Sequence, residues 1–312
     1  MAAISLNKLS AAEAAAKIAA GEASSEAVVE ACLAQIEARD SEIHAWAFID
    51  PENALAQART RDMEAPSGPL HGVPVGIKDV LDTKDMPTEY GSHLYRGNQP
   101  EKDTATVAAL REAGAVILGK TVTTEFASPY PSITRNPLDP ERTPGVSSSG
   151  SAAAVADFMV PIANGTQTGG SVIRPASLCG LYGFKGSLDG LDRSGIRHLK
   201  PSIDTLGLMA RHLEDILLMR QAITGEECVT TPSAPPRIGV TRTHVWPEAQ
   251  LESVHMIESA TERLAAAGAV IADVELPEDF EAVIERFTYI TSYEGVRSTD
   301  DVVAENLDSI NS

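Results

Sequence analysis

Two glycine-containing turns within residues 143–175 carry residue types that can attack a carbonyl group. The first turn holds a run of serines that begins at Ser147, and in the second Ser171 directly follows Gly169 and Gly170. Glycine permits positive φ and close backbone approach, and successive main-chain N–H groups in such a turn can converge on one oxygen. A serine placed right after these donors is well set to attack a carbonyl whose oxygen they hold.

Lys78 is the third candidate, and it lies among apolar residues in the strand-like segment V-P-V-G-I-K-D-V-L. A lysine in such a strand is usually a snorkelling or salt-bridged residue, just as a lone Gly-Gly-Ser is usually a turn. If the amine is buried, however, desolvation lowers its pKa and makes it available as a base. Two serine turns together with an isolated upstream lysine favour this catalytic interpretation.

The elements that must position these residues alternate along the chain. Ser10 and Glu13 form a capping box before an alanine-rich helix, and Pro51–Met63 is predicted to be helical. The strand around Lys78, a helix capped by Asp103, and a buried strand over 115–119 follow in that order. This order predicts right-handed crossovers in a largely parallel sheet. Further strands are expected at 237–240 and 270–274.

Composition narrows the function classes. The chain has 312 residues and a net charge of −19, which argues against nucleic acid and anionic membranes as partners. Its cysteines, Cys32, Cys179 and Cys228, lack C-x-x-C spacing, which fits a reducing cytoplasm. No signal peptide or membrane-spanning apolar run is seen, so a cytoplasmic location is expected. The histidines show no metal-ligand spacing such as H-E-x-x-H.

Three separate motifs resemble the amidase signature family, and the resemblance covers nearly the whole chain. G-I-K-D at Gly76–Asp79 is similar to the family's catalytic-lysine strand, and Ser147–Ala156 is similar to its serine-rich loop. Gly165–Pro175 is similar to its nucleophile turn. The segment Met86–Ser92 and the run S-V-I-R-P look closest to a malonamidase-like branch.

The resemblance implies an α/β fold with a mixed, largely parallel central sheet covered by helices on both faces. We expect a single domain over residues 1–312, with N-terminal helices in 1–65, a catalytic core in 66–222 and a second sheet and helix portion in 223–312. Full-length relatives are longer, so the C-terminal strands of the family sheet would be missing. Such a sheet would expose an edge strand and apolar surface, which a homodimer would cover.

The family's chemistry implies a Ser–Ser–Lys triad. Ser171 would be the nucleophile, Ser147 would relay its proton, and Lys78 would accept it as a neutral amine. The peptide bond before Ser147 would be cis. No metal or cofactor is required, and the partner would be a small-molecule amide that forms an acyl-enzyme.

The same resemblance implies two further groups of site residues. An oxyanion hole would be formed by backbone N–H groups across Thr168, Gly169 and Gly170. Arg174 would grip a substrate carboxylate bidentately or, equally, pair with a buried acidic neighbour. Val146 departs from the family, which usually has glycine there, and a β-branched residue is disfavoured at positive φ.

Three functions remain open from the sequence. The first is an amide hydrolase that releases ammonia from a small, carboxylate-bearing amide. The second is the glutamine-dependent amidotransferase subunit of a tRNA-charging complex, which shares the fold. The third is a shortened, catalytically inactive homologue that acts by assembly.

Overall fold

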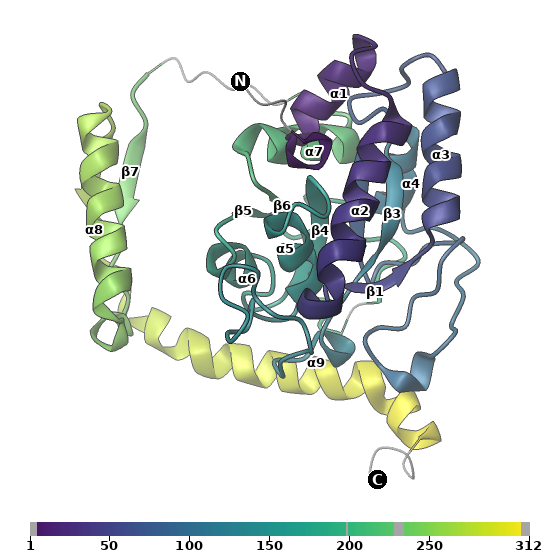
Figure 1. The fold of residues 1–312 in the computed structure, drawn as a ribbon. Helices are drawn as coiled ribbons and strands as arrows, with labels where there is room; N and C mark the ends of the chain where they lie inside the picture. The colour runs from purple at the N-terminus through teal and green to yellow at the C-terminus, as the bar shows by residue number, and fades with distance from the viewer. Residues whose placement is uncertain (1–4, 198, 228–233, 307–312) are drawn as a thin grey trace. The chain divides into compact units, whose positions relative to one another are not determined.

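The computed structural model describes residues 5–197, 199–227 and 234–306 (Figure 1). Residues 1–227 together with 298–312 form one compact unit, and residues 228–297 form a second. The division at 227 falls a few residues after the boundary expected at 223. The residues expected to do chemistry all lie in the first unit.

A six-stranded mixed sheet forms the centre of the first unit, in the order β1-β3-β2-β4-β6-β5. Its strands are β1 (Trp46–Ile49), β2 (Pro74–Lys78), β3 (Val116–Thr121), β4 (Ile162–Gln167), β5 (Tyr182–Lys185) and β6 (Thr205–Ala210). Strand β2 pairs in parallel with β3 and with β4, whereas the pairs β1–β3, β4–β6 and β5–β6 are antiparallel. The sheet is therefore mixed as expected, with its parallel part confined to the centre.

Helices cover both faces of this sheet (Figure 1). The α-helices are α1 (Ala11–Ala19), α2 (Ser25–Ile43), α3 (Pro51–Met63), α4 (Ala105–Glu112), α5 (Ser149–Ala156), α6 (Ile173–Leu178) and α7 (Leu213–Thr224). Short 3-10 helices are η1 (Leu6–Lys8), η2 (His93–Tyr95) and η3 (Glu125–Ala127). One buried cluster joins the sheet to α1, α4 and α7, and another joins it to α2, α3 and α5.

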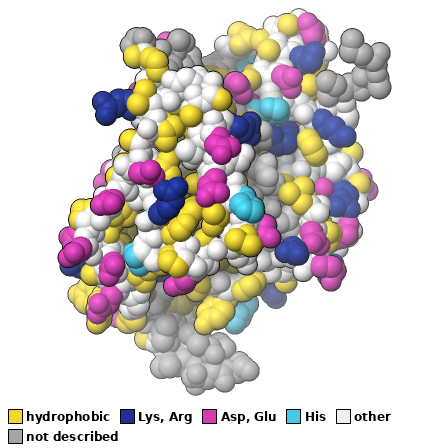
Figure 2. Space-filling model, turned by 90° about the vertical axis from the view of Figure 1, so that its left-hand side faces the viewer, with side chains coloured by type: hydrophobic (Ala, Val, Ile, Leu, Met, Phe, Trp, Pro, Cys, Tyr) yellow, Lys and Arg dark blue, Asp and Glu magenta, His cyan; other side chains and the backbone are white. Residues whose placement is uncertain are grey.

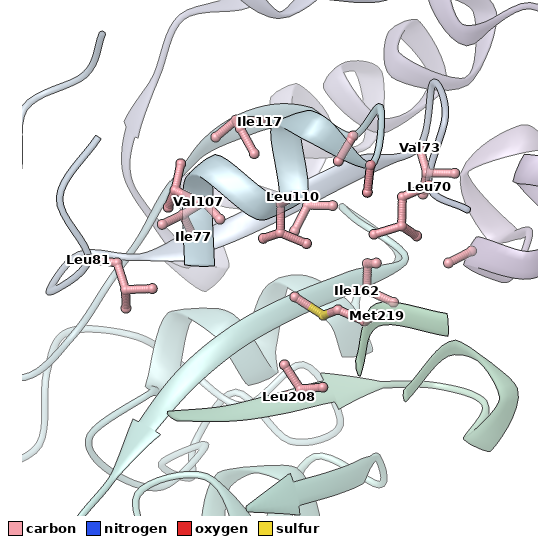
Figure 3. Close-up of a cluster of buried hydrophobic side chains, with 14 of the residues drawn as sticks. Leu70, Val73, Ile77, Leu81, Val107, Leu110, Ile117, Ile162, Leu208 and Met219 are labelled. Atoms are coloured by element: carbon pink, nitrogen blue, oxygen red, sulfur yellow. The ribbon is translucent and has the colours of Figure 1, made fainter. Parts of the chain in front are cut away.

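The alternation of side chains along β2 decides which residue faces which layer. Val75 and Ile77 belong to the cluster with α4 and α7, where Ile77 lies near Leu110 and Ile117 (Figure 3). Each fully buried side chain of this kind contributes about 1.5–3 kcal/mol. Because successive strand residues point to opposite faces, Lys78 is directed to the other side, where α5 packs.

The N-terminal caps of α1 and α4 were both predicted from the sequence. Ser10 and Glu13 form the expected capping box, with Glu13 N donating to Ser10 Oγ at 3.0 Å. The prediction for α4 was wrong, because Thr104 rather than Asp103 is its N-cap and accepts from Val107 N at 3.3 Å. The Asp103 carboxylate is instead occupied by Lys84 N at 2.9 Å and by Arg111.

The β5 edge carries exposed apolar side chains, as expected for an unpaired edge strand. Tyr182 of β5 is 51% exposed, and Leu178 and Ile173 of α6 are 46% and 43% exposed. Contact between α6 and β5 makes these residues neighbours in the fold. Exposed edges of this kind are sites where another strand can pair.

The second unit holds a smaller two-stranded sheet. Strands β7 (Arg237–Val240) and β8 (Val270–Asp273) pair in parallel, which confirms the strands expected there. The helices are η4 (Trp246–Glu248), α8 (Leu251–Ala266), η5 (Glu278–Ala282) and α9 (Val283–Glu305), which runs past the unit's last residue, 297. None of the helices in the described ranges combines the length and apolarity needed to span a bilayer.

One face of the molecule shows how the charge is distributed. Acidic side chains are interspersed there with basic and hydrophobic ones, without a broad basic surface (Figure 2).

Candidate active site

Lys78 ends β2 and its side chain is fully buried. Its backbone N–H donates to Asn164 Oδ1 of β4 at 2.8 Å, which fixes the end of the strand. Its Nζ donates to Ser147 Oγ at 2.8 Å and to Thr166 Oγ1 at 2.9 Å. Burial lowers the pKa of Lys78 to about 7, and the nearby Asp204 carboxylate opposes this shift. The amine is therefore available in its neutral form near neutral pH.

Ser147 lies in the loop that leads into α5. Gly145 carries the positive φ of this loop, 92°, whereas Val146 is not among the described residues with positive φ. The β-branched side chain at position 146 is therefore tolerated. The Val146–Ser147 peptide is cis, as the resemblance implied.

The start of α5 is held close to the backbone of neighbouring strands. A Cβ atom at Gly150 would lie 2.2 Å from Ala45 O and 2.3 Å from Val122 N, so no other residue fits here without movement. Gly150 N donates to Val122 O at 3.0 Å. This close approach fixes the loop that carries Ser147.

Ser171 lies in the turn between β4 and α6. The side chain of Gln167 accepts hydrogen bonds from Val172 N at 2.9 Å and Ile173 N at 3.0 Å, which shapes the turn. Among the described residues, no acceptor is found for the N–H groups of Gly169 and Gly170. These donors are therefore available to a ligand oxygen.

The two serine turns are joined directly. Ser148 N donates to Ser171 O at 3.3 Å, and Ser148 Oγ donates to Thr166 O at 3.4 Å. A single cavity is lined by both Ser147 and Ser171. Lys78 lies directly behind Ser147, so the three residues of the expected triad meet at one place.

Arg174 does not line this cavity. It is exposed on α6. Its guanidinium lies over Gly170, where an added Cβ would be 3.0 Å from Arg174 Nη2.

Sequence reasoning missed the cations that do line the cavity, Arg197 and Lys200. The only signal was the polar, glycine-dotted segment between residues 187 and 204, which is typical of loops near a cleft. Thr166, whose hydroxyl accepts a hydrogen bond from the Lys78 amine, was also missed. Its position in β4, two residues after Asn164, gives it the same face of the strand.

Asp204 links the Arg197–Lys200 loop to the nucleophile turn. Its carboxylate accepts hydrogen bonds from Leu199 N at 3.0 Å, from Lys200 N at 2.8 Å and from the hydroxyl of Thr168. These donors occupy both carboxylate oxygens. Asp204 is therefore built into the cavity wall as a structural residue.

Asp79 orients a neighbouring loop through a second buried lysine. Lys120 Nζ lies 3.3 Å from Asp79 Oδ1, and both side chains are buried. Glu89 N also donates to Asp79 Oδ1 at 3.2 Å. No cluster of three or more histidine, cysteine, aspartate or glutamate residues suited to a metal occurs in the described part of the chain.

The sequence profile described as Amidase matches residues 27–311. A glutamyl-tRNA(Gln) amidotransferase subunit from Thermobifida fusca is 39% identical over 317 residues, covering 93% of this chain and 63% of that protein. The corresponding protein from Chloroflexus aurantiacus is 37% identical over 299 residues, covering 87% of this chain and 61% of that protein. The chain thus spans less than two thirds of the length of these relatives.

Solved structures of amidases share the fold. One amidase crystal structure has a TM-score of 0.89 at 31% identity, covering 96% of this chain and 70% of that one. Native peptide amidase from Stenotrophomonas maltophilia has a TM-score of 0.84 at 30% identity, covering 97% of this chain and 72% of that one. The similarity to a malonamidase-like branch stays a prediction.

Proposed function

Because this chain belongs to the amidase family, whose members act on amide C–N bonds, we propose that it hydrolyses a small amide through an acyl-enzyme on Ser171. The observation that carries this proposal is the hydrogen bond between the fully buried amine of Lys78 and Ser147 Oγ, at 2.8 Å. A neutral amine placed behind a serine that shares a cavity with a second serine forms a proton relay.

The relay accounts for both halves of the reaction. Ser147 takes the proton of Ser171 while passing its own to the Lys78 lone pair, and Ser171 Oγ attacks the substrate carbonyl. Collapse of the tetrahedral intermediate breaks the C–N bond, and the proton returns through Ser147 to the departing nitrogen as ammonia. Water then attacks the ester by the same relay, which releases the acid and restores Ser171.

The backbone N–H groups across Thr168, Gly169 and Gly170 are the proposed oxyanion hole. Those of Gly169 and Gly170 have no acceptor among the described residues. Each such donor typically contributes about 3 kcal/mol to the transition state. The rigid turn shaped by Gln167 pre-organises them at no cost during the reaction.

Covalent labelling tests the nucleophile without knowledge of the substrate. A fluorophosphonate should modify the folded protein at Ser171, which peptide mass spectrometry locates, and Ser171→Ala should abolish the label. Ser177→Ala, which removes an exposed serine on α6, is the matched control and should label normally. Folded protein that is never labelled at Ser171 would contradict the proposal and favour the inactive homologue.

A second candidate, the amidotransferase subunit, is supported by the relatives from Thermobifida and Chloroflexus. The same acyl-enzyme would then form from glutamine, and the ammonia released in that step would pass to a partner protein of the complex. Copurification with such partners and glutamine-dependent amide transfer would favour this function. Ammonia release from small amides by the isolated chain, without partners, would favour the hydrolase.

A further inference from the structure

The cavity beside Ser171 is lined by a guanidinium group, that of Arg197, which forms no ion pair with a carboxylate of the described residues. Arg197 lines this cavity, and its Nη1 donates to the hydroxyl of Tyr95 at 2.7 Å. Its Nε is buried without a hydrogen-bond partner, and no ion pair joins Arg197 to a carboxylate of the described residues. Arg197 is half-buried and lines the cavity, so a ligand that carries negative charge can reach its guanidinium.

Three aromatic rings hold this guanidinium in place. Its Cζ lies 5.2 Å from the ring centre of Tyr90, 4.9 Å from that of Tyr95 and 5.9 Å from that of Phe126. Tyr95 also contacts Tyr90 and Phe126 edge to face. Such contacts stabilise the cation and fix its orientation without neutralising its charge.

The backbone of this aromatic wall adopts a rarely used conformation. Tyr90, Phe126 and Ala127 all have positive φ, at 54°, 47° and 51°, and all line the same cavity as Ser171. Phe126 N donates to Tyr90 O at 2.9 Å, which ties these segments together. Strain of this kind persists where the surroundings enforce it, and it concentrates at ligand sites.

The other charges around Arg197 leave the cavity positive. Lys200 lines it as a second cation, so two cations face one lining carboxylate, that of Asp204, whose oxygens accept hydrogen bonds from the cavity wall. Asp82 lies near Arg197, but its Oδ1 accepts from the hydroxyl of Tyr90 at 2.9 Å and the residue does not line the cavity. The cavity therefore favours a substrate group with negative charge. None of its described lining residues offers an unoccupied carboxylate that could bind a substrate ammonium.

We propose that Arg197 binds a carboxylate of the substrate and so selects monoamides of dicarboxylic acids over neutral amides. This inference rests on the proposed function, because it requires that the scissile amide bind at Ser171. The carboxylate at the other end of the substrate would then bind the Arg197 guanidinium. The apolar walls, which include Val80, Phe126 and Ile196, would contact the methylene groups between them. Glutaramic acid should accordingly be a better substrate than L-glutamine, which adds an ammonium group.

The experiment compares acid and neutral amides of equal length. Wild-type protein should show a higher kcat/KM for succinamic acid than for succinamide, mainly through a lower KM. Loss of a charge-assisted hydrogen-bond pair corresponds to roughly 10- to 100-fold in binding, so Arg197→Gln should reduce this preference by that factor. Arg197→Lys should restore part of it, because the positive charge is kept.

Matched variants separate charge selection from general effects. Arg59→Gln removes a surface cation paired with Glu26 on the helical layer and should leave the preference unchanged. Arg174→Gln tests the arginine for which the sequence left carboxylate binding and a buried ion pair equally open. A loss of preference in Arg174→Gln but not in Arg197→Gln, or an equal loss on both substrates in Arg197→Gln, would overturn the proposal.

Protection from labelling provides a readout that does not need turnover. Succinate should slow fluorophosphonate labelling of Ser171 in the wild type and have at least tenfold weaker effect, by the same estimate of roughly 10- to 100-fold, in Arg197→Gln. If Ser171 is labelled but succinate protects both proteins equally, the inference about Arg197 fails while the proposed nucleophile stands. If neither protein is labelled, the proposed function itself fails.

Discussion

Lys78 Nζ lies 2.8 Å from Ser147 Oγ, although the two residues are 69 positions apart in the chain. A second lysine, Lys120 on the adjacent strand β3, is just as deeply buried, but its Nζ lies 3.3 Å from Asp79 Oδ1. Lys78 Nζ donates to two hydroxyl groups, whereas Lys120 Nζ donates to a hydroxyl and a carbonyl and also lies against a carboxylate. This difference in partner separates a lysine suited to accept protons from one suited to hold loops together.

The pH dependence of activity should follow the Lys78 amine. Burial lowers its pKa to about 7 from its ordinary value of 10.5, and the relay needs the neutral form. Below pH 7 we therefore expect kcat/KM to fall about tenfold per pH unit, measured by ammonia release in buffers of constant ionic strength. An activity that stays constant from pH 5 to pH 9, within about twofold, would rule out this titration.

Replacing each buried lysine by methionine should have opposite consequences. Lys78→Met should abolish labelling of Ser171 yet change the free energy of unfolding by only about 1 kcal/mol at pH 7, because losing two hydrogen bonds is offset by losing the cost of burying an amine. Lys120→Met should destabilise the protein by about 3–5 kcal/mol, because the Asp79 carboxylate would stay buried without its cation.

Urea unfolding and labelling, measured on both variants, check this contrast. Between pH 7 and the ordinary lysine pKa of 10.5, the unfolded chain binds a proton at residue 78 that the folded chain lacks. The Lys78 contribution to folding stability should therefore increase with pH across this window and be absent in Lys78→Met. Full labelling of Lys78→Met would remove this lysine from the mechanism.

Asp204→Asn should loosen the nucleophile turn. The Asp204 carboxylate accepts from Thr168, Leu199 and Lys200, and an amide nitrogen in place of one oxygen would face a donor. We expect a loss of about 1–3 kcal/mol in unfolding free energy. Because Asp204 also raises the pKa of Lys78, the acid limb of the activity profile should move to lower pH; a move to higher pH would contradict this electrostatic coupling.

Gly150→Ala should disrupt the loop that carries Ser147. The new Cβ would lie 2.2 Å from Ala45 O, so backbone atoms must move, at a cost of about 3 kcal/mol. Gly186→Ala is the control, because its Cβ would make an ordinary 3.5 Å contact with the Leu191 side chain. Thermal unfolding should show a marked loss for the first variant alone; equal melting temperatures would show that the approach of α5 is not tight.

The sequence by itself determined the local features that depend on neighbouring residues. The capping box at Ser10, the serine turns and the apolar setting of Lys78 all follow from residue type and short-range spacing. The predicted Asp103 cap was wrong, because the true cap, Thr104, is the next residue in the chain. The Asp103 carboxylate instead binds Lys84 N and Arg111, and these long-range contacts cannot be read from local sequence.

Tertiary structure decided which side chains meet. Whether Lys78 or Lys120 faces a carboxylate depends on strand order, which places Asp79 beside Lys120 and brings Asn164 and Thr166 of β4 to Lys78. Likewise, Arg174 lies three residues after Ser171 yet is exposed on α6, while Arg197 reaches the cavity from a distant loop. Proximity along the chain does not fix where a long side chain points, because the packing of separate segments sets both its burial and its partners.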